Sequence, residues 1–104
     1  MVAYVVASIT ETDPAGFQAY REAAMPVVEA FGGKTLIEPR PEARLEGSAD
    51  NAWSPQRLVI VRFPDIETAK RWHASQEYAG PKAMRQAAAR TEMLLYKGRE
   101  HSDG

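Results

Sequence analysis

The chain lacks cysteine, which excludes disulfides, thiolate metal sites and a thiol nucleophile. It also lacks an excess of charge of one sign: 13 basic side chains stand against 14 acidic ones, and the formal net charge is −1. There is therefore no basic field of the kind that holds nucleic acid or an anionic membrane. No apolar run approaches the ~18 residues of a membrane span. These absences predict a cytoplasmic protein that binds neither nucleic acid nor a membrane.

The sequence also lacks the common motifs for a cofactor or a metal. Gly32-Gly33 follows a predicted helix rather than preceding one, so it is not a phosphate-binding loop. With two histidines and no cysteine, a closed metal site would need clustered carboxylates, and the sequence has no such cluster. A serine triad needs a base, and no nucleophile-elbow signature accompanies His73. We therefore expect no cofactor and no metal.

Four segments have the composition of β-strands, and apolar residues occupy both of their faces. In the third segment, Val59, Val61 and Phe63 lie on one side. Leu58 and Ile60 lie on the other, which is typical of a central strand that is covered on both faces. The four predicted strands are Val2–Ile9, Lys34–Glu38, Arg57–Phe63 and Thr91–Tyr96.

Two helical stretches, about Pro14–Phe31 and Asp65–Ala89, follow the first and third strands. Asp13 and Asp65 are the expected N-caps, since their side chains can accept from the first free backbone N–H groups. Pro26 is expected to kink or restart the first helix, because it removes a backbone donor. Gly32-Gly33 should end that helix, and Gly80-Pro81 should break the second one.

The order of these elements is βαββαβ, which predicts an α+β, ferredoxin-like fold with a four-stranded antiparallel sheet and both helices on one face. The opposite face should be polar in a monomer, yet its residues are apolar. A second copy of the chain is the simplest cover, so we expect a homodimer. We expect one domain over residues 1–97 and a flexible tail over 98–104. Residues 41–56 form the one long connection, with Leu45 and Trp53 as possible anchors.

Several fragments in this order resemble the domain of unknown function 1330 family, within the dimeric α/β-barrel (ferredoxin-like) superfamily. They are Phe63–Tyr78 (FPDIETAKRWHASQEY), Arg85, Phe17–Tyr20, Pro26, Gly32-Gly33, Leu45–Gly47 and Arg57. The chain departs from the family at Pro39-Arg40-Pro41, Arg62 and Gln76, where the family usually has Arg-Gly-Gly, an acidic residue and proline. The resemblance implies a dimeric α/β barrel made from two such sheets. The family has no established activity, so the resemblance supports architecture rather than function.

His73 and Arg57 are candidate site residues, and each has two interpretations. His73, next to Trp72, is either a general acid/base lining the space between helix and sheet, or a half-buried side chain bonded to a carbonyl. Glu77, four residues on, is its one possible acidic partner. Arg57 either forms an ion pair with Glu46 that closes a hairpin, or receives a substrate carboxylate on its planar fork.

Tyr20, Tyr78 and Arg85 are predicted to converge at one end of the sheet. As a polar cluster they would bind a small aromatic or acidic ligand. Each also has a structural interpretation: Tyr20 continues a buried stripe, Tyr78 anchors a helix break, and Arg85 binds helix-end carbonyls.

Three functions are compatible with these patterns. The first is a homodimeric domain that binds a small organic molecule between sheet and helices, with Arg57, His73, Tyr78, Tyr20 and Arg85 as candidate ligand-binding residues. The second is a cofactor-poor enzyme, such as a monooxygenase or isomerase, as the superfamily resemblance permits. The third is a structural or interaction module.

Overall fold

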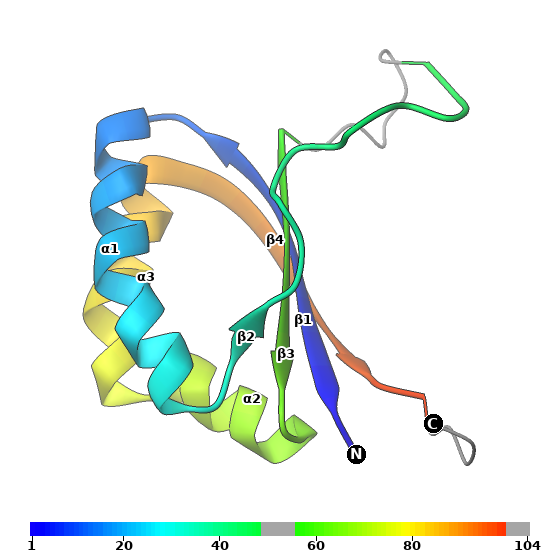
Figure 1. Cartoon of the computed structure of the whole chain (residues 1–104). Helices are drawn as coiled ribbons and strands as arrows, with labels where there is room; N and C mark the ends of the chain where they lie inside the picture. Colours follow the sequence, from blue (N-terminus) through cyan, green and yellow to red (C-terminus); the bar gives the residue numbers. More distant parts are fainter. Residues whose placement is uncertain (49–55, 100–104) are drawn as a thin grey trace.

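The computed structural model describes residues 1–48 and 56–99 of the chain. It confirms the α+β, ferredoxin-like architecture: a four-stranded antiparallel sheet of order β2-β3-β1-β4, with all helices on one face (Figure 1). β3 is a central strand, as its pattern predicts. The elements are β1 (Ala3–Glu11), α1 (Pro14–Ala30), β2 (Lys34–Thr35), β3 (Arg57–Phe63), α2 (Ile66–Ala74), α3 (Gln76–Ala88) and β4 (Ala89–Lys97).

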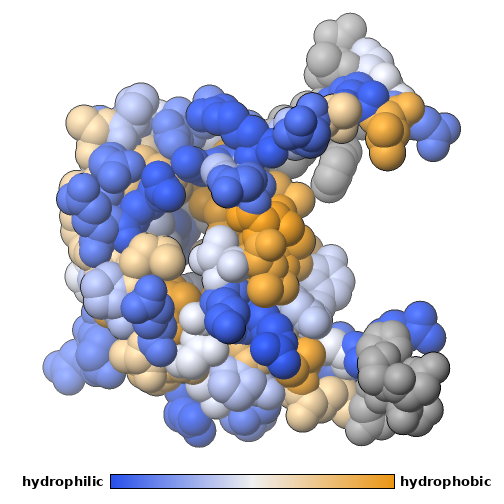
Figure 2. All heavy atoms as spheres, in the orientation of Figure 1, coloured by the Kyte–Doolittle hydropathy of each residue, from blue (hydrophilic) through white to orange (hydrophobic). Residues whose placement is uncertain are grey.

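The two faces of the sheet have different surroundings. Alternate residues of β1, from Ala3 to Ile9, are buried under the helices, and so is Phe63 of β3. The other face follows the opposite alternation, and in the described part of the chain no helix covers it (Figure 1). Figure 2 shows a hydrophobic surface over the sheet. We call these the covered face and the open face.

α1 forms as its sequence predicts at both ends. Asp13 is the N-cap and accepts from the Gly16 N–H at 3.2 Å. Gly32 has a φ of +78° just beyond the last helical turn, the left-handed conformation that glycine adopts at little cost. The helix does not restart at Pro26 but runs through it. Ala24 and Val28, on either side of Pro26, are both buried in the core, so packing holds the helix together across the missing hydrogen bond.

The second predicted helix is broken at Ser75 rather than at Gly80-Pro81, so the described residues form three helices. The Ser75 hydroxyl accepts from the Tyr78 N–H at 3.1 Å and donates to the Trp72 carbonyl at 2.8 Å. One side chain thus closes α2 and caps α3. Pro81 lies within α3, where its ring removes one backbone donor without ending the helix.

β2 is shorter than predicted, because it ends at Thr35 instead of Glu38. Beyond it only single bonds to β3 continue, from the Leu36 N–H to the Ile60 carbonyl and from the Leu58 N–H to the Pro39 carbonyl. Pro39 therefore lies at the sheet edge, as expected of a residue that cannot donate. We call residues 36–48 the arm.

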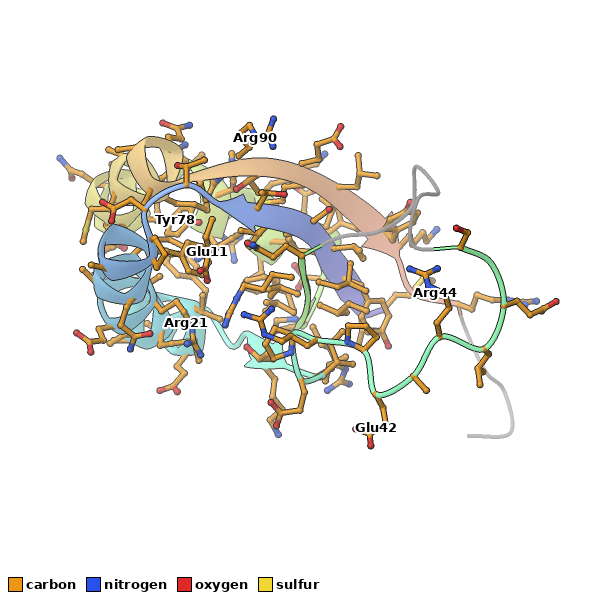
Figure 3. All side chains as sticks on the ribbon, turned by 90° about the horizontal axis from the view of Figure 1, so that it is seen from above. Glu11, Arg21, Glu42, Arg44, Tyr78 and Arg90 are labelled. Atoms are coloured by element: carbon orange, nitrogen blue, oxygen red, sulfur yellow. The ribbon has the colours of Figure 1, made fainter. Side chains whose placement is uncertain are left out.

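Beyond Pro39 the arm extends away from the sheet, and Figure 3 shows Glu42 and Arg44 on it. Leu45, a predicted anchor, is 92 % exposed and anchors nothing within the chain. Trp53, the other predicted anchor, and residues 100–104 of the predicted tail lie outside the described residues. Gly98, at the start of that tail, donates its N–H to the Val2 carbonyl at 2.8 Å.

Candidate functional site

A cavity of about 120 Å³ lies between α1 and the covered face of the sheet. Its walls are mainly apolar side chains of β1, β3 and α1, and Trp72 and Met93 also line it. The polar residues of the lining are few: Tyr20, Arg21, Thr35 and Arg57. A concave, mostly apolar space with a few polar groups is the usual form of a small-molecule site.

Arg57 is the charged group of this cavity, and it is only 9 % exposed. Its Nε lies 3.6 Å from Glu11 Oε1, and its Cζ lies 5.3 Å from the centre of the Phe17 ring. Burial lowers the pKa of Arg57, the positive charges of Arg21 and Arg40 lower it further, and Glu11 opposes them. The guanidinium remains charged at neutral pH, as arginine does in proteins.

The ion pair of Arg57 is made with Glu11 and not with Glu46, which corrects the predicted hairpin pair. β1 continues two residues beyond its predicted end at Ile9, and Ile9 lies opposite Arg57 in the register. Glu11 is therefore the diagonal neighbour of Arg57 on the same face of the sheet. Glu46 instead lies on the arm, which leads away from the sheet.

Tyr20, Tyr78 and Arg85 do come together, between α1 and α3. The hydroxyl oxygens of Tyr20 and Tyr78 are 2.9 Å apart, Tyr78 is completely buried, and Arg85 is 6 % exposed. Burial and the neighbouring Tyr78 raise the pKa of Tyr20 far above its ordinary value, although Arg85 acts in the opposite direction through its charge and a hydrogen bond. Tyr20 therefore keeps its proton. Of the three, only Tyr20 is among the residues that line the cavity, and Tyr78 and Arg85 interact with its hydroxyl.

His73 does not join this group, because it lies in a second hollow. This groove, of about 240 Å³, runs between α2 and β4 and is lined by Lys70, His73 and the Met93–Leu95 segment. His73 is partly exposed, and its ring lies beside those of Trp72 and Tyr78. Partial burial of the ring, then the charges of Lys82 and Arg85, lower its pKa below the ordinary 6.5. Glu77, the proposed partner, is not among the groups that shift it.

Trp72 is a polar group of the site that the sequence pattern did not single out. It lines both the cavity and the groove, and its indole Nε1 is buried with no hydrogen-bond partner among the described residues. Buried indole N–H groups usually have a partner. In sequence, a tryptophan on the buried stripe of a helix is typical of core packing, so only the structure reveals the free donor.

Within residues 1–48 and 56–99, no group of three or more histidine, aspartate or glutamate side chains is placed to hold a metal ion. No helix there is long and apolar enough to cross a membrane.

The sequence profile of the family described as a domain of unknown function (DUF1330) matches residues 2–99. The chain belongs to this family. A comparison with curated proteins finds no significant match. Membership of DUF1330 agrees with the fragments that suggested it, and the profile spans every helix and strand described above.

Solved structures show where the DUF1330 fold recurs. A protein of unknown function from Rhodopseudomonas palustris superposes with a TM-score of 0.76 at 19 % identity, over 96 % of this chain and 84 % of that one. SnoaB, a cofactor-independent oxygenase from Streptomyces nogalater, gives 0.63 at 15 % identity, over 99 % and 97 %. A putative antibiotic biosynthesis monooxygenase from Nitrosomonas europaea gives 0.54 at 13 % identity, over 93 % and 89 %. At these identities the likeness shows the shared fold alone.

Proposed function

We propose that this chain is a homodimeric domain that binds a small organic molecule in the cavity between α1 and the sheet. The observation that supports binding is the cavity itself, which is mostly apolar and bordered by Tyr20 and Arg57. An apolar cavity of about 150 Å³ in another protein holds benzene, so a space of about 120 Å³ is close to the size of one six-membered ring. The free indole N–H of Trp72 adds a donor for a ligand oxygen.

The open face of the sheet supports the dimer. Ile60, Val6 and Leu94 follow one another across β3, β1 and β4, with Leu36, just beyond β2, beside Ile60; Leu94 is 58 % exposed. Soluble monomers rarely expose contiguous apolar patches of more than a few hundred Å². A second open face has the same residues and the same shape, so two copies would bury this surface against each other.

The binding proposal is tested by filling the cavity. Ala24→Leu adds bulk at the cavity wall, whereas Ala19→Leu makes the same change at an exposed position of the same helix. In a thermal-shift screen of small aromatic compounds, we expect stabilisation of the wild type, about 2.7 kcal/mol for a ligand at ~100 times its Kd. Ala24→Leu should abolish this response and Ala19→Leu should keep it, with circular dichroism confirming that both variants fold. No response from the wild type would contradict binding and favour an interaction module.

A cofactor-poor enzyme is the second candidate, and Tyr20 is the observation that favours it. A protonated tyrosine held by Tyr78 and Arg85 at a cavity wall is a fixed donor for a developing oxyanion. The likeness to SnoaB, itself described as a cofactor-independent oxygenase, is compatible with an oxygenase or isomerase. Turnover or oxygen uptake with a ligand from the screen, lost in Tyr20→Phe while binding persists, would establish it. Binding without turnover would contradict the enzyme and favour a small-molecule binding domain.

A further inference from the structure

The mouth of the cavity carries more positive than negative charge. Arg21 and Arg57 both line the cavity, and Arg40 follows Pro39, which also lines it. Glu11 is the one carboxylate that acts on Arg57. Among the charged groups that act on Arg57, two are cations and one is an anion, in a chain whose overall charge is −1.

Arg57 is only partly neutralised by Glu11. The pair joins Nε to Oε1 at 3.6 Å, which is longer than the 2.7–2.9 Å typical of a charge-assisted hydrogen bond. Within the described residues, no hydrogen bond is made by its terminal guanidinium nitrogens. Arg21 donates only to the neutral side-chain oxygen of Gln18, at 3.3 Å. Both groups therefore keep donors for an anion, and the planar fork of arginine suits a carboxylate.

The apolar part of the cavity begins directly beside these charges. The guanidinium of Arg57 lies over the ring of Phe17, and Phe17 and Tyr20 form a tilted aromatic pair with centroids 5.4 Å apart. Trp72 lines the same space, and its indole N–H has no hydrogen-bond partner among the described residues. A ligand that satisfies this arrangement has an anionic end for the mouth and a flat apolar body of about one ring.

We propose that the ligand of the cavity is a single-ring aromatic carboxylate, with its carboxylate bound by Arg57 and Arg21 and its ring held between Phe17 and Trp72. This inference rests on the proposed binding function and names the chemical class of its ligand. Arg40 adds positive charge at the mouth. A purely apolar ring would leave the guanidinium donors unused, and a small inorganic anion would leave the apolar walls empty.

Benzoate and benzamide test this proposal, because they share a ring and differ in charge. Titration calorimetry on the whole chain at low salt should give benzoate an affinity about 10–100-fold higher than benzamide, the range expected of hydrogen bonds to a charged group. Arg21→Gln and Arg57→Gln should each remove most of that preference. Arg71→Gln, at an exposed position on α2, should retain it.

Arg21→Gln is the decisive variant, since Arg21 is exposed and its replacement should leave the fold intact, whereas Arg57→Gln also removes the partner of Glu11. Benzamide binding as tightly as benzoate would overturn the carboxylate assignment while leaving the binding function in place. A benzoate preference that survives Arg21→Gln would overturn the assignment of the arginines. Binding of neither compound, together with no response in the wider screen, would overturn both proposals.

Discussion

The covered and open faces of the sheet are built from neighbouring residues of the same kind, yet they have different surroundings. Val61 and Val5 form a row across the covered face, and both are buried. The adjacent row, one residue along each strand, consists of Ile60 and Val6 and lies on the open face. Leu94 extends that second row to the edge of the sheet and is more than half exposed. Hydrophobicity therefore does not decide which face the helices cover.

The two faces differ in burial because the chain leaves the strands toward one side of the sheet. Both helical connections pack on one face, as expected of a split βαβ unit, and the alternation of strand side chains then assigns every residue to one side. A shift of register by one residue would exchange the two sets. Phe63 on the covered face and Leu94 on the open face allow this difference to be tested.

Phe63→Ala should have the largest effect, because Phe63 is completely buried on the covered face and its ring lies 5.1 Å from that of Trp72. The cavity left behind should lower the free energy of unfolding by about 3–5 kcal/mol. Tyr96→Ala, on the open face and 52 % exposed, is the control and should cost less than about 1 kcal/mol in dilute monomer. Chemical denaturation measures both. Equal midpoints for the two variants would show that the faces do not differ in burial.

Leu94→Glu tests the open face, where we expect a change of assembly rather than of fold. A charge on a buried dimer surface would be desolvated without a partner, so the variant should be monomeric at micromolar concentration. Met84→Glu makes a similar change on the surface of α3 and should leave the dimer intact. Light scattering gives the mass and circular dichroism the fold. A monomeric wild type would refute the dimer outright.

The pattern of apolar residues predicted the fold because it is repeated many times along the chain. Phe63 and Pro39 show this well: alternation placed the first in the core, and a missing donor placed the second at an edge. The sequence misplaced features that depend on a single polar atom. Ser75 breaks the helix through one hydroxyl, and Glu11 reaches Arg57 because β1 is two residues longer than its apolar run.

The candidate site was predictable where helical spacing alone determined it. Tyr20 and Tyr78 point into the layer between the helices, and they meet there. Arg57 and His73 do not meet, because Trp72 stands between the cavity and the groove and lines both. Successive residues of a helix are about 100° apart, so Trp72 facing the core directs the next residue, His73, away from it. Packing sets the rotation of α2 about its own axis, and the sequence did not determine which of these two residues faces the core.

His73 gives the smallest effect and the finest test, because it belongs to neither the cavity nor the core. Its folded-state pKa lies below the ordinary 6.5, since burial and the charges of Lys82 and Arg85 disfavour the imidazolium. The unfolded chain therefore binds the proton more readily. The contribution of His73 to stability is complete above the unfolded pKa and declines as the pH falls through 6.5 to the folded value.

We expect an NMR titration of the ring protons, assigned with a His73→Ala variant, to give a midpoint below 6.5 that rises in Lys82→Gln. Because the groove is separate from the cavity, His73→Ala should leave the benzoate affinity unchanged. A midpoint at or above 6.5 would contradict the inference that burial and neighbouring charges lower the pKa of His73. A lost benzoate response would instead mean that the cavity and the groove act as one site, with Trp72 as a movable partition between them.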